Sequence, residues 1–317
     1  MSTTLFILVP VGVLMIAWSL CYVGCGLPDT GTATPFYQYQ NTVTGTSGLV
    51  AFWPLDETSG TTADDIGPNG FDGTYTTGPN VPTYNAADQS DAAPGTYTLN
   101  QPNIVAGDSS GNSESTLNKC PIFNGGYVNV PWNAALGPAS APYQFTIEAW
   151  VVPNWTLDDA QTNPSYRTVI AHNVNLPSNS PPTFQGFLLC ASPKNLWTVA
   201  IYDGSQQQFA TTGNNQTIVQ GSLYFLVVTY DGTKAKNQLT LWVNPADTTQ
   251  PPDAQLSTGY VPVSSPVPLY IGIGGTFLPT PLIPFNGQIQ DVAFYNVVLD
   301  GKTIETHYAN GSGIVLS

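Results

Sequence analysis

Glutamates and histidines are the residues here that are best suited to acid–base catalysis, and they are few and scattered. The glutamates are Glu57, Glu114, Glu148 and Glu305, and the histidines are His172 and His307. Glycoside hydrolysis needs two carboxyl groups held close together, one as an acid and the other as a nucleophile or base. The glutamates show no such pairing, and the histidines lack the spacing of metal ligands. We therefore predict that the protein is not an enzyme, and that Glu148, which lies within an apolar run, points outward from a strand.

One short motif resembles that of serine hydrolases. Residues 107–111 read GDSSG, which fits the Gly-x-Ser-x-Gly pattern. That chemistry requires a strand before the serine and a helix after it, because the nucleophile sits on a sharp turn between them. Both flanks of residues 107–111 are polar and show neither pattern. We interpret the match as a coincidence.

The charge balance excludes nucleic acid as a partner. The 317 residues include 6 Lys and Arg against 20 Asp and Glu, a formal net charge of −14. A protein that binds nucleic acid needs a basic surface to displace counterions from the phosphates. The hydrophobic fraction of 42% is enough for a core, and 30 glycines and 28 prolines favour many turns. This composition predicts a β-rich globular domain.

The N-terminus is long, apolar and free of charge. Residues 5–27 read LFILVPVGVLMIAWSLCYVGCGL, which includes Leu5, Phe6, Ile7, Leu14 and Trp18. As a helix these residues would span about 34 Å, longer than the bilayer core of about 30 Å. We predict that residues 1–27 form a hydrophobic membrane anchor. A cleaved signal, a signal lipidated at Cys25 and a helix buried against another protein remain alternatives, although the basic start of a signal peptide is absent.

The remaining chain divides into a linker and one domain. Residues 28–48 are polar and rich in Thr, Gly and Pro, which is typical of a tether. Residues 49–317 are predicted to form the folded domain, with a long loop at about 76–118 that has no sustained periodicity. An acidic, turn-rich and lysine-poor domain suits the extracytoplasmic side of a membrane.

Short strand patterns follow one another along the domain. In FTIEAWVV, residues 145–152, alternation places Phe145, Ile147, Ala149 and Val151 on one face and Trp150 on the other. We expect the first set to face the opposing sheet and Trp150 to cover the outer surface. Similar runs occur at 49–53, 127–130, 187–190, 196–201, 224–230, 239–243, 269–273 and 288–295. Many short strands with few helical patterns, the exception being 301–309, predict an all-β antiparallel sandwich.

Seven segments together resemble a known family. They are LVAFWPLDETSGTTADDIGPNGFDGTY at 49–75, PIFNGGYVNV at 121–130, FTIEAWVVP at 145–153, LYFLVVTYDG at 223–232, LTLWVN at 239–244, LYIGIG at 269–274 and PFNGQIQDVAFYNVVLD at 284–300. In this order they are similar to the concanavalin A-like jelly-roll domains of the laminin-G-like, pentraxin-related type. The resemblance implies an antiparallel jelly-roll β-sandwich over about 49–309. It says less about function, because such domains include lectins, adhesins, enzyme-appended modules and structural domains.

The resemblance also implies a structural calcium ion. Many relatives bind one between the first loop and a late strand, and the matching residues here are Asp65, with Asp64 beside it, and Asp291. Calcium takes six to eight oxygen ligands, so carbonyls of the loop 67–70 would complete the shell. Relatives commonly have two consecutive acids in the late strand, whereas here Gln290 precedes Asp291. The alternative is that Asp64 and Asp65 only organise a turn.

Cys120 and Cys190 are the two cysteines within the domain. An extracytoplasmic location would permit a disulfide between them. The sequence does not give their separation in space, so they are a candidate pair only.

Two functions fit these observations. The first is a non-enzymatic, membrane-anchored surface module that binds a glycan or a protein. The alternative is a structural subunit of a membrane-containing virion, a sheath or a surface filament. In that case the N-terminal helix would pack against neighbouring subunits, and the protein would reside in a virion or an extracellular assembly.

Overall fold

The computed structural model describes residues 38–78, 80–81, 93–108, 119–138, 140–156, 166–176, 183–264, 266–274 and 284–313. All of these residues belong to one compact unit. The predicted anchor, with Leu5, Phe6, Ile7, Leu14 and Trp18, lies outside the described residues, as does the linker up to residue 37. Across the part of the chain that the structure describes, no helix is both long and apolar enough to cross a membrane.

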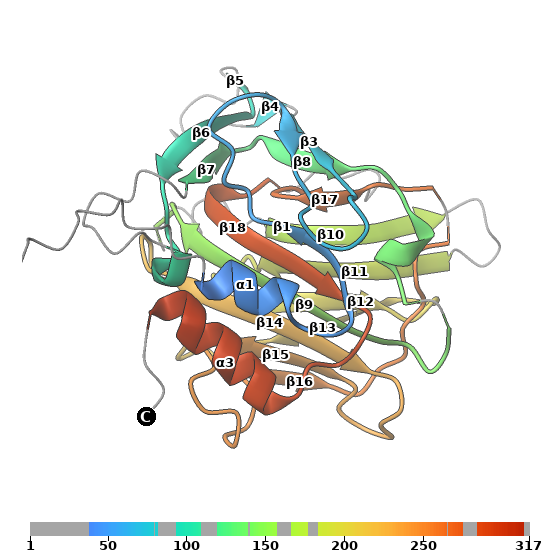
Figure 1. Ribbon diagram of the computed structural model, residues 1–317. Coiled ribbons are helices and arrows are strands. Elements are labelled where there is room, and N and C mark those ends of the chain that lie inside the picture. Colours follow the sequence, from blue (N-terminus) through green and yellow to red (C-terminus); the bar gives the residue numbers. More distant parts are fainter. Residues whose placement is uncertain are drawn as a thin grey trace, which may run out of the picture. The chain divides into compact units, whose positions relative to one another are not determined.

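Two antiparallel eight-stranded sheets form a β-sandwich (Figure 1). In sheet A the order is β16-β15-β14-β9-β18-β7-β6, and β1 pairs with the C-terminal part of β18. Its strands are β1 (Leu49–Trp53), β6 (Thr96–Pro102), β7 (Lys119–Asn124), β9 (Gln144–Pro153), β14 (Tyr224–Asp231), β15 (Leu239–Val243), β16 (Ala254–Leu256) and β18 (Asn286–Tyr295). The predicted all-β sandwich of antiparallel sheets is confirmed.

Sheet B has the order β13-β12-β11-β10-β17-β8-β3-β2. Its strands are β2 (Thr62–Ala63), β3 (Gly73–Thr76), β8 (Tyr127–Val130), β10 (Arg167–Leu176), β11 (Thr183–Ala191), β12 (Trp197–Tyr202), β13 (Gln207–Thr211) and β17 (Leu269–Ile271). Outside the two sheets lie the short pair β4 (Asn80–Val81) and β5 (Ala93–Pro94), and the 3-10 turns η2 (Ala106–Asp108) and η3 (Ala134–Leu136).

The main core lies between the two sheets, and β9 contributes to it as predicted. Phe145, Ile147, Ala149 and Val151 are all fully buried members of this core. The Phe145 ring lies 5.6 Å from the ring of Phe187, which belongs to sheet B, so the two sheets are in direct contact there. The alternation of apolar residues therefore correctly identified the inner face of the strand.

Two helices from opposite ends of the described chain lie side by side on the outer face of sheet A (Figure 1). They are α1 (Gln38–Thr44) and α3 (Gly301–Ser312). The amide of Asn310 in α3 donates to the Thr42 hydroxyl in α1 at 2.7 Å and accepts from the Gln38 amide at 2.7 Å. These hydrogen bonds join the helices directly.

The presence of α1 corrects the predicted linker. Tyr39 and Val43 of this helix are fully buried against sheet A, in a second apolar cluster. Residues 38–44 were assigned to the polar tether 28–48 because polar residues outnumber apolar ones there. Two well-placed apolar side chains are enough to dock this helix of about two turns, so the folded domain begins earlier than predicted. By contrast, α3 confirms the predicted helix at 301–309, and it extends to Ser312.

Trp150 belongs to this second cluster and not to the solvent-facing surface. It is 1% exposed, and its ring stacks on Phe225 at 4.5 Å and on Tyr308 of α3 at 6.0 Å. A Cβ atom at Gly311 would overlap the Trp150 ring, so the glycine permits the close approach of α3. The strand faces were predicted correctly, but the helices that cover the outer face were not.

The predicted loop at about 76–118 contains regular structure. β6, within this stretch, pairs with β7 and forms an edge of sheet A. The turn η2 follows it and carries the buried residue Asp108. Exposed and half-buried residues alternate regularly along β6, but none of its residues is fully buried, as is typical of an edge strand.

The candidate disulfide is not formed, because Cys120 and Cys190 are both buried, free cysteines. Cys120 lies in β7 of sheet A, where its thiol contacts the Ile289 carbonyl at 3.6 Å. Cys190 lies in β11 of sheet B and clusters with Leu188 and Ala200, apart from the main core. Because neighbouring residues of β11 fill the space between the sheets, Cys190 points away from sheet A and cannot reach Cys120.

Candidate functional site

Asp65 organises the first loop through its carboxylate. Its Oδ1 accepts hydrogen bonds from the backbone amides of Phe52 at 2.7 Å and Gly67 at 2.8 Å, and its Oδ2 accepts from Phe71 at 2.7 Å. Asp64 is exposed, and its backbone amide donates to Glu57. These contacts match the alternative prediction for Asp65, that of a turn residue, because backbone amides already occupy both carboxylate oxygens.

Asp291 lies in a different environment. It sits at a bulge in β18 with φ of +53°, and its side chain is fully buried. Neither of its carboxylate oxygens has a hydrogen-bond partner among the described residues. Burial raises the pKa of Asp291, and the nearby acids Asp108, Asp56 and Glu148 raise it further. The acids that face Asp291 are therefore not the ones that sequence reasoning selected.

Asp108 is the second member of this group. Its Oδ1 accepts from the backbone amides of Tyr39 at 2.9 Å and Gln40 at 3.2 Å, at the start of α1. Its Oδ2 is buried without a hydrogen-bond partner among the described residues. Burial raises the pKa of Asp108 to about 7, and Asp56 adds to the shift, although the two backbone hydrogen bonds oppose it. We call Asp56, Asp108 and Asp291 the carboxylate cluster.

The carboxylate cluster offers oxygen atoms of the kind that calcium prefers. The orphaned oxygens of Asp108 and Asp291 are suited to a cation or a proton, because a buried charge without a partner is costly. Within the described ranges, however, no group of three or more His, Cys, Asp and Glu side chains is placed to hold a metal ion. A cation here would take most of its ligands from backbone carbonyls and water. Sequence reasoning missed Asp108 because it lies in the stretch assigned to a loop.

Glu148 points outward from its strand, to the outer face of sheet A, as predicted, but the two helices bury it completely. Its Oε1 accepts from the Tyr39 hydroxyl at 3.1 Å and from the Tyr295 hydroxyl at 2.7 Å. The imidazole of His307 in α3 contacts Glu148 through Nδ1 at 2.9 Å. Glu148 therefore connects sheet A to both α1 and α3.

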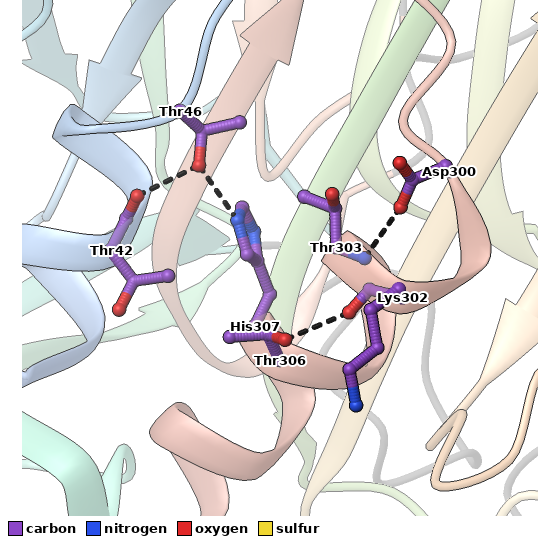
Figure 2. Close-up of a pocket in the computed structure, with 7 residues that line it drawn as sticks. All are labelled: Thr42, Thr46, Asp300, Lys302, Thr303, Thr306 and His307. Carbon is purple, nitrogen blue, oxygen red and sulfur yellow. Dashed lines mark hydrogen bonds between the residues drawn. The ribbon is translucent and has the colours of Figure 1, made fainter.

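A pocket of about 210 Å³ lies between α1 and α3, next to this contact (Figure 2). It is lined by Thr42, Thr46, Asp300, Lys302, Thr303, Thr306 and His307. The Nε2 atom of His307 lies 2.9 Å from the Thr46 hydroxyl, which donates to the Thr42 carbonyl at 2.8 Å. Hydroxyl, imidazole and buried carboxylate are thus in the order of a catalytic triad.

The Thr46 hydroxyl is tied to the backbone of α1. It donates to the Thr42 carbonyl, one turn earlier in the chain, and lies against Nε2 of His307. The other nitrogen of the imidazole, Nδ1, contacts both oxygens of the buried Glu148 carboxylate. We interpret the arrangement as a structural hydrogen-bond network that joins α1, α3 and sheet A.

A larger pocket, of about 400 Å³, lies at the edge of sheet B around β11, β12 and β13. We call it the edge pocket, and its lining residues are Tyr166, Ser192, Pro193, Lys194, Leu196, Thr198, Phe209, Thr211, Thr212 and Asn214. The rings of Tyr166 and Phe209 are stacked, with centroids 6.1 Å apart and planes inclined by 15°. Phe209 is 40% exposed, which is unusual for a large apolar ring.

Polar groups in the edge pocket have free hydrogen-bonding capacity. The Thr212 hydroxyl is buried without a hydrogen-bond partner among the described residues. The Thr198 hydroxyl lies within hydrogen-bond distance of the Thr211 hydroxyl, at 3.1 Å, and of the Leu196 carbonyl, at 3.3 Å. Sequence reasoning missed this site, and the only signal was Phe209, an aromatic residue that follows three glutamines, 206–208.

The comparison with protein families gives one match. The model of the concanavalin A-like lectin/glucanases superfamily matches residues 124–305, which is more than half of the chain. No curated protein matches the sequence.

Several solved structures are similar to this chain at low sequence identity. The binding domain of Paraclostridial Mosquitocidal Protein 1 is 14% identical with a TM-score of 0.51, over 82% of this chain and 52% of that one. Botulinum neurotoxin type C, whose cell entry depends on two ganglioside molecules, is 13% identical with a TM-score of 0.46, over 85% and 52%. Trypanosoma rangeli sialidase in complex with sialic acid is 15% identical with a TM-score of 0.47, over 86% and 36%. The chain thus spans about half or less of each matched structure.

Proposed function

Because the chain belongs to the concanavalin A-like lectin/glucanases superfamily, we propose that it is a non-enzymatic module that binds carbohydrate in the edge pocket. The observation that carries this proposal is the stacked, partly exposed pair of Tyr166 and Phe209 beside free hydroxyls. Aromatic faces bury large apolar areas, which suits the C–H face of a sugar ring. The hydroxyls of Thr211 and Thr212 can exchange hydrogen bonds with sugar hydroxyls.

The edge pocket also has the size and support of a binding site. Its volume of about 400 Å³ falls within the range of roughly 300–1,000 Å³ that is common for ligand pockets. Phe209 and Thr211 lie on β13, which pairs with β12 along five residue pairs. Side chains on paired strands are held more firmly than those on free loops, so the ring and the hydroxyls are positioned before a ligand arrives.

The experiment is a titration of the full chain with a panel of oligosaccharides, using Phe209→Ala as the test variant. We expect at least one sugar class to bind, and Phe209→Ala to weaken it at least tenfold with little change in melting temperature. Trp132→Ala is the matched control, because Trp132 is similarly exposed at 37% but does not line the edge pocket. No binding by any sugar class, or equal losses in both variants, would contradict the proposal.

The proposal includes attachment to a membrane through residues 1–27, with the domain outside the cytoplasm. The support is the uncharged apolar run 5–27 and its length of about 34 Å as a helix. The full chain should therefore remain with membranes after a carbonate wash, and its mass should still include the N-terminal residues. A mature N-terminus near Gly26 would contradict an anchor and support a cleaved signal.

We further propose that calcium is the cofactor, held by Asp108 and Asp291 of the carboxylate cluster. The support is their three buried oxygens without hydrogen-bond partners among the described residues. Calcium would offset the mutual repulsion of these acids. No basic side chain is among the groups that shift the pKa values of Asp108 and Asp291. Asp64 and Asp65 are not part of this proposed site.

A further inference from the structure

Among the described residues, Lys194 is one of three lysines, with Lys119 and Lys236, that form no ion pair, and of these three it is the one that lines the edge pocket. The chain has 6 basic side chains against 20 acids. Lys234 pairs with Asp231 at 3.8 Å, and Lys302 pairs with Glu305 at 4.0 Å. Lys194 is exposed and makes no ion pair or hydrogen bond with any described residue. Its ammonium group is therefore available to a ligand.

The backbone that carries Lys194 is firmly held at the rim of the edge pocket. It lies in the turn between β11 and β12, where the Ser192 amide donates to the Leu196 carbonyl at 2.8 Å. The next residue, Asn195, is fully buried, accepts from the Trp155 indole at 2.7 Å and donates to the Ile218 carbonyl at 2.9 Å. Hydrogen bonds within the turn and from Asn195 to its neighbours thus hold the backbone in place, while the lysine side chain remains free to extend over the pocket.

We propose that the edge pocket selects an acidic carbohydrate, a sugar that bears a carboxylate or a sulfate. The sugar ring lies against Tyr166 and Phe209, and the acidic group pairs with the ammonium of Lys194. This inference rests on the proposed carbohydrate binding and adds the class of sugar. Tyr166, Phe209 and Lys194 line the same pocket, together with the unpartnered hydroxyl of Thr212.

Electrostatics gives the physical reason for this choice. A protein with a net charge of −14 repels anions in general, so an anionic ligand binds only where a local cation offsets that field. An ammonium gains more from pairing with an anion than from a neutral hydroxyl, since charge-assisted hydrogen bonds are about twice as strong as neutral ones. A neutral sugar would use the rings and hydroxyls but leave Lys194 unused.

The test compares matched neutral and acidic probes on the full chain. Galactose and galacturonic acid oligosaccharides form one pair, and a sulfated galactose oligosaccharide distinguishes sulfate from carboxylate as the acidic group. We expect the acidic probes to bind at least tenfold more tightly than the neutral one, and added salt to reduce the difference. Lys194→Met should lower the ratio of acidic to neutral affinity to about one (from the tenfold preference expected above), and Lys194→Arg should retain the preference.

Lys236→Met is the matched control, because it removes the same charge from an exposed lysine that does not line the edge pocket. It should leave the acidic preference intact. Equal binding of neutral and acidic probes, with Lys194→Met unchanged, would overturn the inference and leave the proposed carbohydrate binding in place. Absence of binding by any probe would overturn both.

Discussion

Nδ1 of His307 in α3 lies 2.9 Å from a carboxylate oxygen of Glu148 in β9, with both side chains buried and 159 residues apart in sequence. Two tyrosine hydroxyls, from Tyr39 and Tyr295, donate to the same glutamate. The pair therefore fastens the C-terminal helix to the centre of sheet A, and the α1 tyrosine joins the same carboxylate. The contact helps to hold the two helices against the outer face of this sheet.

Removing one partner of this pair should be costly. His307→Ala leaves the buried Glu148 carboxyl without its imidazole partner, and removing one partner of a buried pair typically destabilises by about 3–5 kcal/mol. Urea unfolding of the full chain measures the loss. Lys302→Met, on the exposed side of the same helix, should change the free energy of unfolding by less than about 0.5 kcal/mol. A loss below about 1 kcal/mol for His307→Ala would show that the pair contributes little.

The raised pKa of Asp108 predicts how the stability of the protein depends on pH when no calcium is present. Its pKa is raised to about 7 from an ordinary value of 3.8, so between these values the folded protein binds more protons than the unfolded chain. The contribution to stability is then fully present below the unfolded pKa and is lost as pH rises through about 7. In the presence of a chelator, the melting temperature of the full chain should be higher at about pH 5.5 than at about pH 8, two values that bracket the shifted pKa. Asp108→Asn should reduce that difference, and an unchanged pH profile in this variant would contradict the assignment.

Calcium should reverse this trend if it occupies the carboxylate cluster. Binding to the folded state alone stabilises by about 2.7 kcal/mol when the free ion is at 100 times its dissociation constant. Millimolar calcium should therefore raise the melting temperature at neutral pH, and less so in acid, where protons compete for the same oxygens. Asp291→Asn should remove the gain, whereas Asp64→Asn, at an exposed position outside the carboxylate cluster, should retain it. Equal melting of the wild-type chain in calcium and chelator would mean that protons alone neutralise these acids.

The substitution Gly311→Ala tests the packing of α3 on Trp150. Alanine normally stabilises a helix interior by up to about 1 kcal/mol relative to glycine. Here the added methyl group would overlap the Trp150 ring, and overpacking typically costs about 1–3 kcal/mol. We therefore expect Gly311→Ala to lower the free energy of unfolding in thermal or urea melts. Combining it with Trp150→Leu should give a smaller loss than the sum of the two single variants, since the smaller side chain makes room. Strict additivity would contradict the contact.

Much of the sandwich could be predicted from the sequence. Alternation along residues 145–152 identified Phe145 and Ile147 as core residues, because neighbouring side chains of a strand must point to opposite faces. The short apolar runs between turn residues predicted an all-β fold, and the pattern at 301–309 predicted α3. These are local properties, and each depends on a few consecutive residues.

Only the tertiary structure decided what covers the outer face and which polar groups meet. The period of β9 placed Glu148 and Trp150 on that face, but it could not show that α1 and α3 would bury them. Asp108 raises the pKa of Asp291, and Tyr166 stacks on Phe209, across long stretches of sequence. Such contacts are set by how the strands and turns are ordered in space, and no local pattern encodes that order. Both proposed sites, the edge pocket and the carboxylate cluster, arise from it.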